Sequence, residues 1–447
     1  MKKLLIINFA VFLFLVLSCK THKEGEVSQS INQENISETQ GYEKNALMSS
    51  LNNLNKKMEE AEKKISDTNK TSDNIIDFSL NFFKNVSEGQ KDNICISPAS
   101  LNAAMAMAYT GADGRTAQEM SDVLKFDSDK NQFHNNFNAY GIYLAYLSSK
   151  DNLDFNYVNR IFVEKTFNLL PSYISIINKY YSGNFQEQDF IHNHEKALVE
   201  INDWVYKETR KKIKDLLSKN NINEDTRAVL VNALYLKSEW RYKFKEHKTK
   251  EEKFFINKDK NQTVEVFFMN ENNLRYKIYV DNKVKVLELP YKSNEISLLI
   301  VLPESSNSEN IQEFIPSASE YKKYIDELKY EEVRVSIPKF KIEMGFSAKK
   351  TFQKMGIISA FEDYADFSEM TEKKDIKISD IIQKVFFEID EHGTEAAAAT
   401  AVVMQLTSMP VESQQKIDFI ANKPFMFILK DNTFNTPLFS GIIINPK

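Results

Sequence analysis

Apolar side chains recur with two different periods along this 447-residue chain. Helical spacing begins at Ile75, Ile76 and Phe78, with Ser72 or Asp73 as the expected N-cap, and prevails to about residue 218. Short β-rich runs follow at residues 228–236, 263–269, 283–289, 296–302, 332–337, 417–420, 425–429 and 438–444. Helices followed by strands, without regular alternation of the two, predict an α+β fold.

The N-terminal residues have the pattern of a targeting segment. Lys2 and Lys3 precede an apolar run over residues 4–17, which is short for a membrane span and typical of a signal peptide. Residues 16–19, Val-Leu-Ser-Cys, resemble the lipobox of bacterial lipoproteins, in which Cys19 becomes the lipidated first residue. We therefore expect a lipoprotein signal peptide over residues 1–18 and a lipid anchor at Cys19; a plain secretory signal is the alternative.

Residues 19–71 are polar and are predicted to form a tether, because they contain too few large apolar groups to fold alone. The tether is expected to be partly helical, since apolar residues recur at helical spacing at Leu51, Leu54, Met58, Ala61 and Ile65. Lys20 after the cysteine favours the outer membrane of a bacterial envelope, with either the periplasmic or the outer face open. The globular domain is then residues 72–447.

Composition excludes several functions. The net charge of -5 gives nucleic-acid binding no electrostatic support, and 2 cysteines build no disulfide framework. The chain has no Gly-x-Ser-x-Gly elbow, and its 11 glycines form no phosphate-binding loop. His192 and His194 match no zinc pattern and are predicted to lie in a solvated loop, and Ser97 before Pro98 fits a helix cap better than a nucleophile. We therefore expect no enzyme, no metal and no cofactor.

An ordered series of motifs from residue 72 to the end resembles the serpin family. The motifs lie at residues 93–100 and 111–120, 201–205 before a basic helical run to 217, 230–237 with Trp240, 287–291, 337–340, 365–370, 422–427 and 437–441. Each motif alone is weak, but the ordered set is specific. The resemblance implies the serpin fold, with three β-sheets, eight or nine helices and an exposed reactive-centre loop over about residues 391–415.

The segment from residue 391 to 403 permits two interpretations. Its four consecutive alanines favour an ordinary helix on local grounds. The resemblance identifies it instead as the hinge of the reactive loop, formed by Glu391, Gly393, Thr394, Glu395, Ala396, Ala397, Ala398, Ala399 and Thr400. In serpins, a protease that cuts this loop is trapped as an acyl-enzyme when the loop inserts into the central sheet as a new strand. We adopt this second interpretation.

Strand alternation supports an inhibitory hinge. It places residues 394, 396, 398, 400, 402 and 404 on one row, which the serpin resemblance implies is the core-facing one, and none of them is charged. A charge on that row would have to lose its water during insertion, at a cost of several kcal/mol if it were unpaired. The uncharged row therefore favours a suicide-type inhibitor of serine endopeptidases. Inhibition of papain-like cysteine proteases and a non-inhibitory surface-binding role are the alternatives.

The usual loop length of the family puts the scissile bond between Thr407 and Ser408, with Leu406 and Met404 as alternative sites of cleavage. Threonine before the cut suits elastase-like or subtilisin-like proteases, which have small or restricted specificity pockets. Residues 394–415 contain no lysine or arginine, so trypsin-like targets are disfavoured. The expected partners are a serine protease and, through the lipid, a membrane; the protein itself is expected to be a monomer.

Two further sites follow from the resemblance. Ser97, Ser100 and Asn232 match the polar cluster beneath the central sheet that is called the shutter. Gln383 stands where the family often has histidine, so the cluster can keep its hydrogen bonds but is not expected to respond to pH. Trp240 matches the tryptophan of the breach, where the loop first enters the sheet.

Overall fold

A computed structural model describes Lys56 and residues 70–150, 153–181, 183–257, 261–304, 308–372, 376–394 and 416–447. The chain divides into two compact units, Met1–Lys64 and Ile65–Lys447, and the fold below is that of the second. The predicted signal peptide, Cys19 and all of the tether before residue 70 except Lys56 lie outside the described residues. Within the described ranges, no helix has the length and apolar character that a membrane crossing requires.

The described part contains eight α-helices, in agreement with the predicted number. They are α3 (Lys70–Ser87), α4 (Pro98–Gly111), α5 (Gly114–Leu124), α6 (Lys130–Ser148), α7 (Pro171–Tyr180), α8 (Phe190–Glu208), α9 (Ala318–Asp326) and α10 (Lys349–Met355). Short 3-10 helices are η1 (Glu246–Lys248), η2 (Ser308–Phe314) and η3 (Ser359–Phe361). Every residue of α4 is buried, and Ser97 caps it as predicted, with Pro98 in the first turn.

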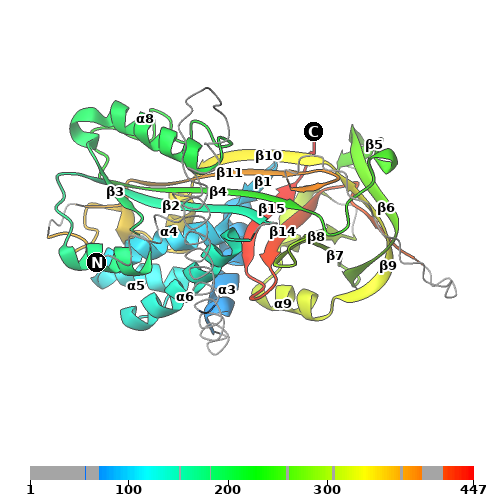
Figure 1. Cartoon of the computed structure of the whole chain (residues 1–447), viewed down its shortest axis with the longest axis horizontal. Helices are drawn as coiled ribbons and strands as arrows, with labels where there is room; N and C mark the ends of the chain where they lie inside the picture. Colours follow the sequence, from blue (N-terminus) through cyan, green and yellow to red (C-terminus); the bar gives the residue numbers. More distant parts are fainter. Residues whose placement is uncertain are drawn as a thin grey trace, which may run out of the picture. The chain divides into compact units, whose positions relative to one another are not determined.

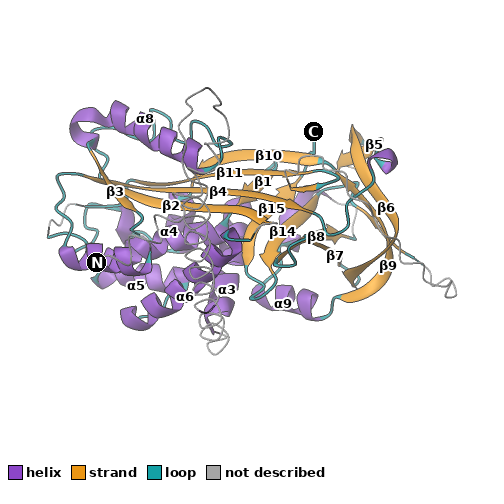
Figure 2. Cartoon of the chain, viewed as in Figure 1, coloured by secondary structure: helices purple, strands orange, loops and turns teal. Residues whose placement is uncertain are grey.

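Two hydrogen-bonded sheets contain the strands (Figure 2). The six-stranded sheet has the order β10 (Phe340–Ser347), β11 (Asp380–Ile389), β12 (Gly393–Thr394), β4 (Ala228–Glu239), β2 (Leu153–Glu164) and β3 (Phe185–Gln188). The nine-stranded sheet has the order β1 (Ile94–Ile96), β15 (Pro437–Ile443), β14 (Phe425–Asp431), β8 (Ile296–Pro303), β7 (Val284–Pro290), β6 (Gln262–Val280), β9 (Lys329–Pro338) and β13 (Ile417–Ile420), with β5 (Lys250–Asn257) on β6. All eight predicted β-rich runs fall on strands, so the α+β class is confirmed. The long strand β6 pairs with β5, β9 and β7 in turn along its length. This shared strand joins two of the three predicted sheets into one.

The six-stranded sheet is covered on both faces (Figure 1). Helix α8 lies on one face, where Ile201 and Val205 pack with Val231 of β4 and Phe386 of β11. Helices α4, α5 and α6 lie on the other side, over the larger core that also includes β8 and β14. A strand inserted into this sheet would therefore meet packed side chains on both faces.

Four local predictions need correction. Helix α3 begins before Ser72 and Asp73, so neither is its cap, and Asp73 instead lies in the first turn, where the helix dipole favours an acid. The helical region also contains β2, a 12-residue strand paired on both sides. His192 and His194 lie in α8, whose first turn is capped by Asp189, and not in a loop. The basic run after α8 is not helical, because Arg210 and Lys211 adopt left-handed backbone angles.

His134 should make the protein sensitive to acid. Burial, with smaller contributions from Lys130 and Lys179, lowers the pKa of this side chain from 6.5 to about 4. The unfolded chain takes up the proton at the higher pH, so the stabilisation is complete above pH 6.5 and is lost as the pH falls toward 4. The expected loss is on the order of 3 kcal/mol.

Urea unfolding measured across that pH window checks this expectation. The variant His134→Gln, which keeps a hydrogen-bonding group near the Tyr181 hydroxyl, should show a flatter decline than the parent. Identical pH profiles for parent and variant would show that His134 is not responsible.

Candidate functional site

The predicted hinge begins where the six-stranded sheet splits. From Asp380 to Val385, β11 pairs directly with β4 in parallel. Farther along, β12 lies between them: Thr394 pairs with Ile389 of β11, and Thr394 and Gly393 pair with Ser238 and Glu239 of β4. The sheet is thus joined at one end and already opened at the other by the first two residues after the hinge turn.

Only glycine fits at position 393. Its φ of 149° is one that other residues rarely adopt, and a Cβ atom there would clash with the Ser238 carbonyl oxygen. The turn before it is held by Asp390, whose Oδ1 accepts hydrogen bonds from the backbone N–H of His392 at 2.7 Å and of Gly393 at 3.1 Å. The Asp390 N–H in turn donates to the Gly393 carbonyl at 2.9 Å. The local sequence therefore closes a tight hairpin that returns the chain into the sheet.

Thr394 is buried at the split, with 1% of its surface exposed. Its hydroxyl lies 2.5 Å from the hydroxyl of Tyr291. Tyr291 is the residue directly after β7, a strand of the nine-stranded sheet. Tyr291 stacks on Trp240 at 4.4 Å between ring centroids, and Trp240 donates from Nε1 to the Asp390 carbonyl at 2.8 Å. The predicted breach residue therefore contacts the hinge turn directly. Tyr291 is not among the predicted site residues; its one sequence signal is the Leu-Pro-Tyr motif at 289–291.

Glu391 fixes the other side of the turn. Its carboxylate pairs with the Lys339 ammonium at 2.9 Å and accepts a hydrogen bond from the Thr249 hydroxyl at 2.7 Å. Burial opposes ionisation of Glu391, but these two partners outweigh it and hold the pKa of the carboxyl below its ordinary value. The charge is therefore retained at neutral pH, and it ties the end of β11 to the strands around it.

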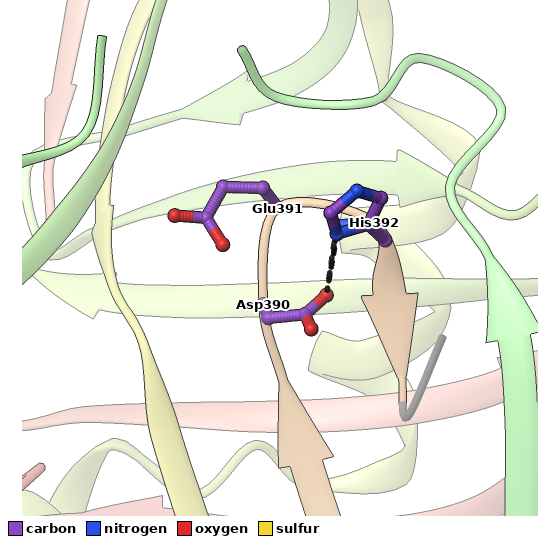
Figure 3. A group of neighbouring side chains, drawn as sticks. All are labelled: Asp390, Glu391 and His392. Carbon is purple, nitrogen blue, oxygen red and sulfur yellow. Dashed lines mark hydrogen bonds and ion pairs between the residues drawn. The ribbon is translucent and has the colours of Figure 1, made fainter. Parts of the chain in front are cut away.

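Asp390, Glu391 and His392 place potential metal-ligand atoms within 4.8 Å of one another (Figure 3). The Glu391 carboxylate, however, points away from the imidazole and is already bonded to Lys339 and Thr249. His392 lies between two acids, with Nε2 3.3 Å from Glu246 and Nδ1 3.8 Å from Asp390. This geometry suits a set of polar contacts that stiffens the turn.

The four predicted shutter residues form one buried hydrogen-bonded cluster beneath the joined part of the sheet. Gln383 accepts from the Ser97 N–H at 2.8 Å and donates to the Ser97 carbonyl at 3.0 Å and to Asn232 Oδ1 at 2.5 Å. Asn232 donates to the Ser100 hydroxyl and to Asn159. Gln383 and Asn232 are direct partners across β11 and β4, so separating these strands must break their bond.

Asn159 of β2 is a member of this cluster that sequence reasoning missed. Its Oδ1 accepts from Ser100 at 3.1 Å and from Asn232, while its buried Nδ2 has no hydrogen-bond partner within the described ranges. The remaining predicted hinge residues, Glu395 to Thr400, and the predicted scissile pair, Thr407 and Ser408, lie outside the described residues.

Comparisons with known proteins agree with this geometry. A family model described as serpin (serine protease inhibitor) matches residues 73–446. The leukocyte elastase inhibitor of Xenopus laevis is 35% identical over 377 residues, which are 83% of this chain and 97% of that protein. The crystal structure of Serpin48 from the insect Tenebrio molitor is 29% identical, with a TM-score of 0.73 over 84% of this chain and 98% of that one. Human thyroxine-binding globulin in complex with thyroxine is 28% identical, with a TM-score of 0.74 over 85% and 100%. The chain therefore belongs to the serpin family, and its relatives support protease inhibition as its general activity.

Proposed function

We propose that this protein is a suicide inhibitor that traps serine endopeptidases as covalent acyl complexes. The observation that supports this most is the position of Gly393 and Thr394 between β4 and β11. The first residues of the loop are already paired within the sheet, so insertion only has to extend this strand. Each further inserted residue would replace a parallel pair between β4 and β11 with two antiparallel pairs, one to each of these strands. The exchange adds backbone hydrogen bonds. The trap is driven by this gain once cleavage frees the loop.

The register of β12 assigns a place to each following residue. If it continues, Ala398 comes between Leu234 and Val385, the last pair of the joined segment, and Thr400 comes between Asn232 and Gln383. The amides of Asn232 and Gln383 now bond to each other, and the Thr400 hydroxyl would offer each of them a new partner. On the opposite row, residues 399 and 401 would pass beneath α8, where alanine is the side chain that requires the least displacement.

The target class follows from the loop. With cleavage between Thr407 and Ser408, an elastase-like or subtilisin-like protease accommodates the threonine, and the name of the Xenopus laevis relative points to the same class. Mixing the purified protein with pancreatic elastase and with subtilisin tests the proposal. A protease-containing band that survives boiling in detergent supports it, whereas complete cleavage without such a band, over a broad panel of serine proteases, contradicts it.

Two alternatives are decided by adding papain-like cysteine proteases to this panel. A complex with papain-like enzymes alone would make the chain an inhibitor of cysteine proteases. The other alternative is a non-inhibitory binding role, and the human thyroxine-binding globulin in complex with thyroxine is a precedent for ligand binding in this fold. The uncharged core-facing row from residue 394 to 404 favours the inhibitory role, because its burial would not require a charge to lose its water.

We also propose that the inhibitor is a bacterial lipoprotein, anchored to the cell envelope through Cys19 and held at a distance by residues 20–71. The variant Cys19→Ala should move the protein from the membrane pellet to the soluble fraction, because the lipidation site is lost. Ser18→Ala, which keeps the cysteine, serves as the control. The fractions are compared by immunoblot after high-salt washing, and equal retention of the Cys19→Ala variant and the parent would contradict the anchor.

A further inference from the structure

Beside the nine-stranded sheet, the hinge meets a side chain that is not among the predicted site residues: the Thr394 hydroxyl contacts Tyr291. Tyr291 is fully buried directly after β7, and its position is set by backbone bonds to the end of β4. The backbone N–H of Arg241 donates to the Pro290 carbonyl at 2.9 Å, and the backbone N–H of Lys292 donates to the Glu239 carbonyl at 2.8 Å. These bonds bracket the tyrosine on both sides, and Trp240 stacks on its ring. These contacts fix the Tyr291 hydroxyl at the position where Thr394 enters the sheet.

We propose that Tyr291 is a positioning residue that recognises the hydroxyl of residue 394 and holds the hinge in the split sheet before any protease binds. Valine at position 394 would fill nearly the same volume but would leave the buried tyrosine hydroxyl unpaired. Serine would keep the bond. Burial also raises the pKa of Tyr291, so its hydroxyl stays protonated and can donate at any pH the protein meets.

This inference rests on the proposed trapping mechanism and deepens it. The trapped fraction depends on a race between insertion of the cleaved loop and hydrolysis of the acyl-enzyme. Because residue 394 is already paired with β4 and β11, the first step of loop insertion is complete before cleavage. Loss of the Tyr291–Thr394 bond should therefore shift the outcome toward simple cleavage, without changing how fast the protease attacks the loop.

Hydrogen–deuterium exchange on the uncleaved protein tests, without any protease, whether Tyr291 holds the hinge at residue 394. Tyr291→Phe, which keeps the ring stacked on Trp240, and Thr394→Val should each raise exchange in the peptide spanning residues 389–394 by about fivefold, the ratio that corresponds to one neutral hydrogen bond. The double variant should match the single ones, and Thr394→Ser should resemble the parent. Tyr321→Phe is the matched control, because that hydroxyl bonds to the Asn435 carbonyl, outside the hinge turn.

Trapping experiments test the consequence, with subtilisin and pancreatic elastase as probes. Tyr291→Phe and Thr394→Val should each lower the number of trapped proteases per cleaved inhibitor by about fivefold, with Thr394→Ser and Tyr321→Phe near the parent. Unchanged exchange in both variants would overturn the inference, and so would unchanged or improved trapping beside a parent that traps. A parent that traps neither protease would count against the proposed function, while the exchange result would still decide whether Tyr291 holds the hinge.

Discussion

Thr394→Arg should turn the inhibitor into a substrate. At position 394 the side chain is buried between Ser238 and Ile389 and meets the Tyr291 hydroxyl, so a guanidinium group there would lie in the protein interior without a carboxylate partner. An unpaired buried charge costs at least several kcal/mol, and a loss of about 3 kcal/mol in the insertion step corresponds to roughly a hundredfold fewer trapped proteases. Cleavage of the loop should continue at an undiminished rate.

A second arginine variant provides the matched control. In the proposed insertion, alternation puts residue 395 on the opposite row, and this residue already carries a charge, so Glu395→Arg should leave most of the trapping intact. Both variants are mixed with the same protease, and covalent complex and cleaved inhibitor are quantified on one denaturing gel. Equal trapping by Thr394→Arg and the parent would contradict insertion at this position, and equal loss in both variants would contradict the assigned alternation.

Thr407→Arg should redirect the inhibitor to trypsin. The specificity pocket of trypsin contains an aspartate that binds arginine before the scissile bond, and the parent loop offers no basic residue from 394 to 415. The rate of trypsin inhibition should rise by on the order of a thousandfold, because a polar pocket built for a charge rejects threonine strongly. Inhibition of elastase-like proteases should fall in parallel, since their small pocket excludes the longer side chain.

The mass of the released C-terminal fragment locates the cut in the same experiment. A fragment that begins at Ser408 supports the assigned bond. Leu406→Arg is the control, because arginine one residue earlier would give a fragment that begins at Thr407 and should lower trapping by shortening the loop. Trypsin resistance of Thr407→Arg, or cleavage elsewhere in the loop, would show that the assigned bond is wrong.

Much of the fold could be predicted from the sequence where one physical signal dominated. The apolar runs of β7, β8 and β14 are buried throughout or nearly so, and their composition identifies them as strands. Strand β2 is harder to predict, because it follows a long helix and polar residues interrupt it at Asp154, Asn156 and Asn159. Without β2, Asn159 could not be placed beside Asn232, and one member of the polar cluster was missed.

The site was predictable only in part, for a related reason. Gly393, Thr394 and Glu391 lie in one continuous motif, so a single resemblance located all three. Tyr291 contacts Thr394 from 103 residues away and from a different sheet. A contact of that kind depends on how two sheets meet at Trp240, and no local pattern of side chains encodes it. Likewise, His392 pairs through its imidazole with a glutamate of η1, a partner that only the fold brings near.

Covalent trapping is tested most directly by the mass of the complex formed with a serine protease. The predicted result is an ester between the catalytic serine of the protease and Thr407 of this chain, in a complex that survives boiling and has lost the C-terminal fragment that begins at Ser408. Complete cleavage at residue 407 with fully active protease recovered, and no such ester at any protease concentration, would contradict the proposed mechanism.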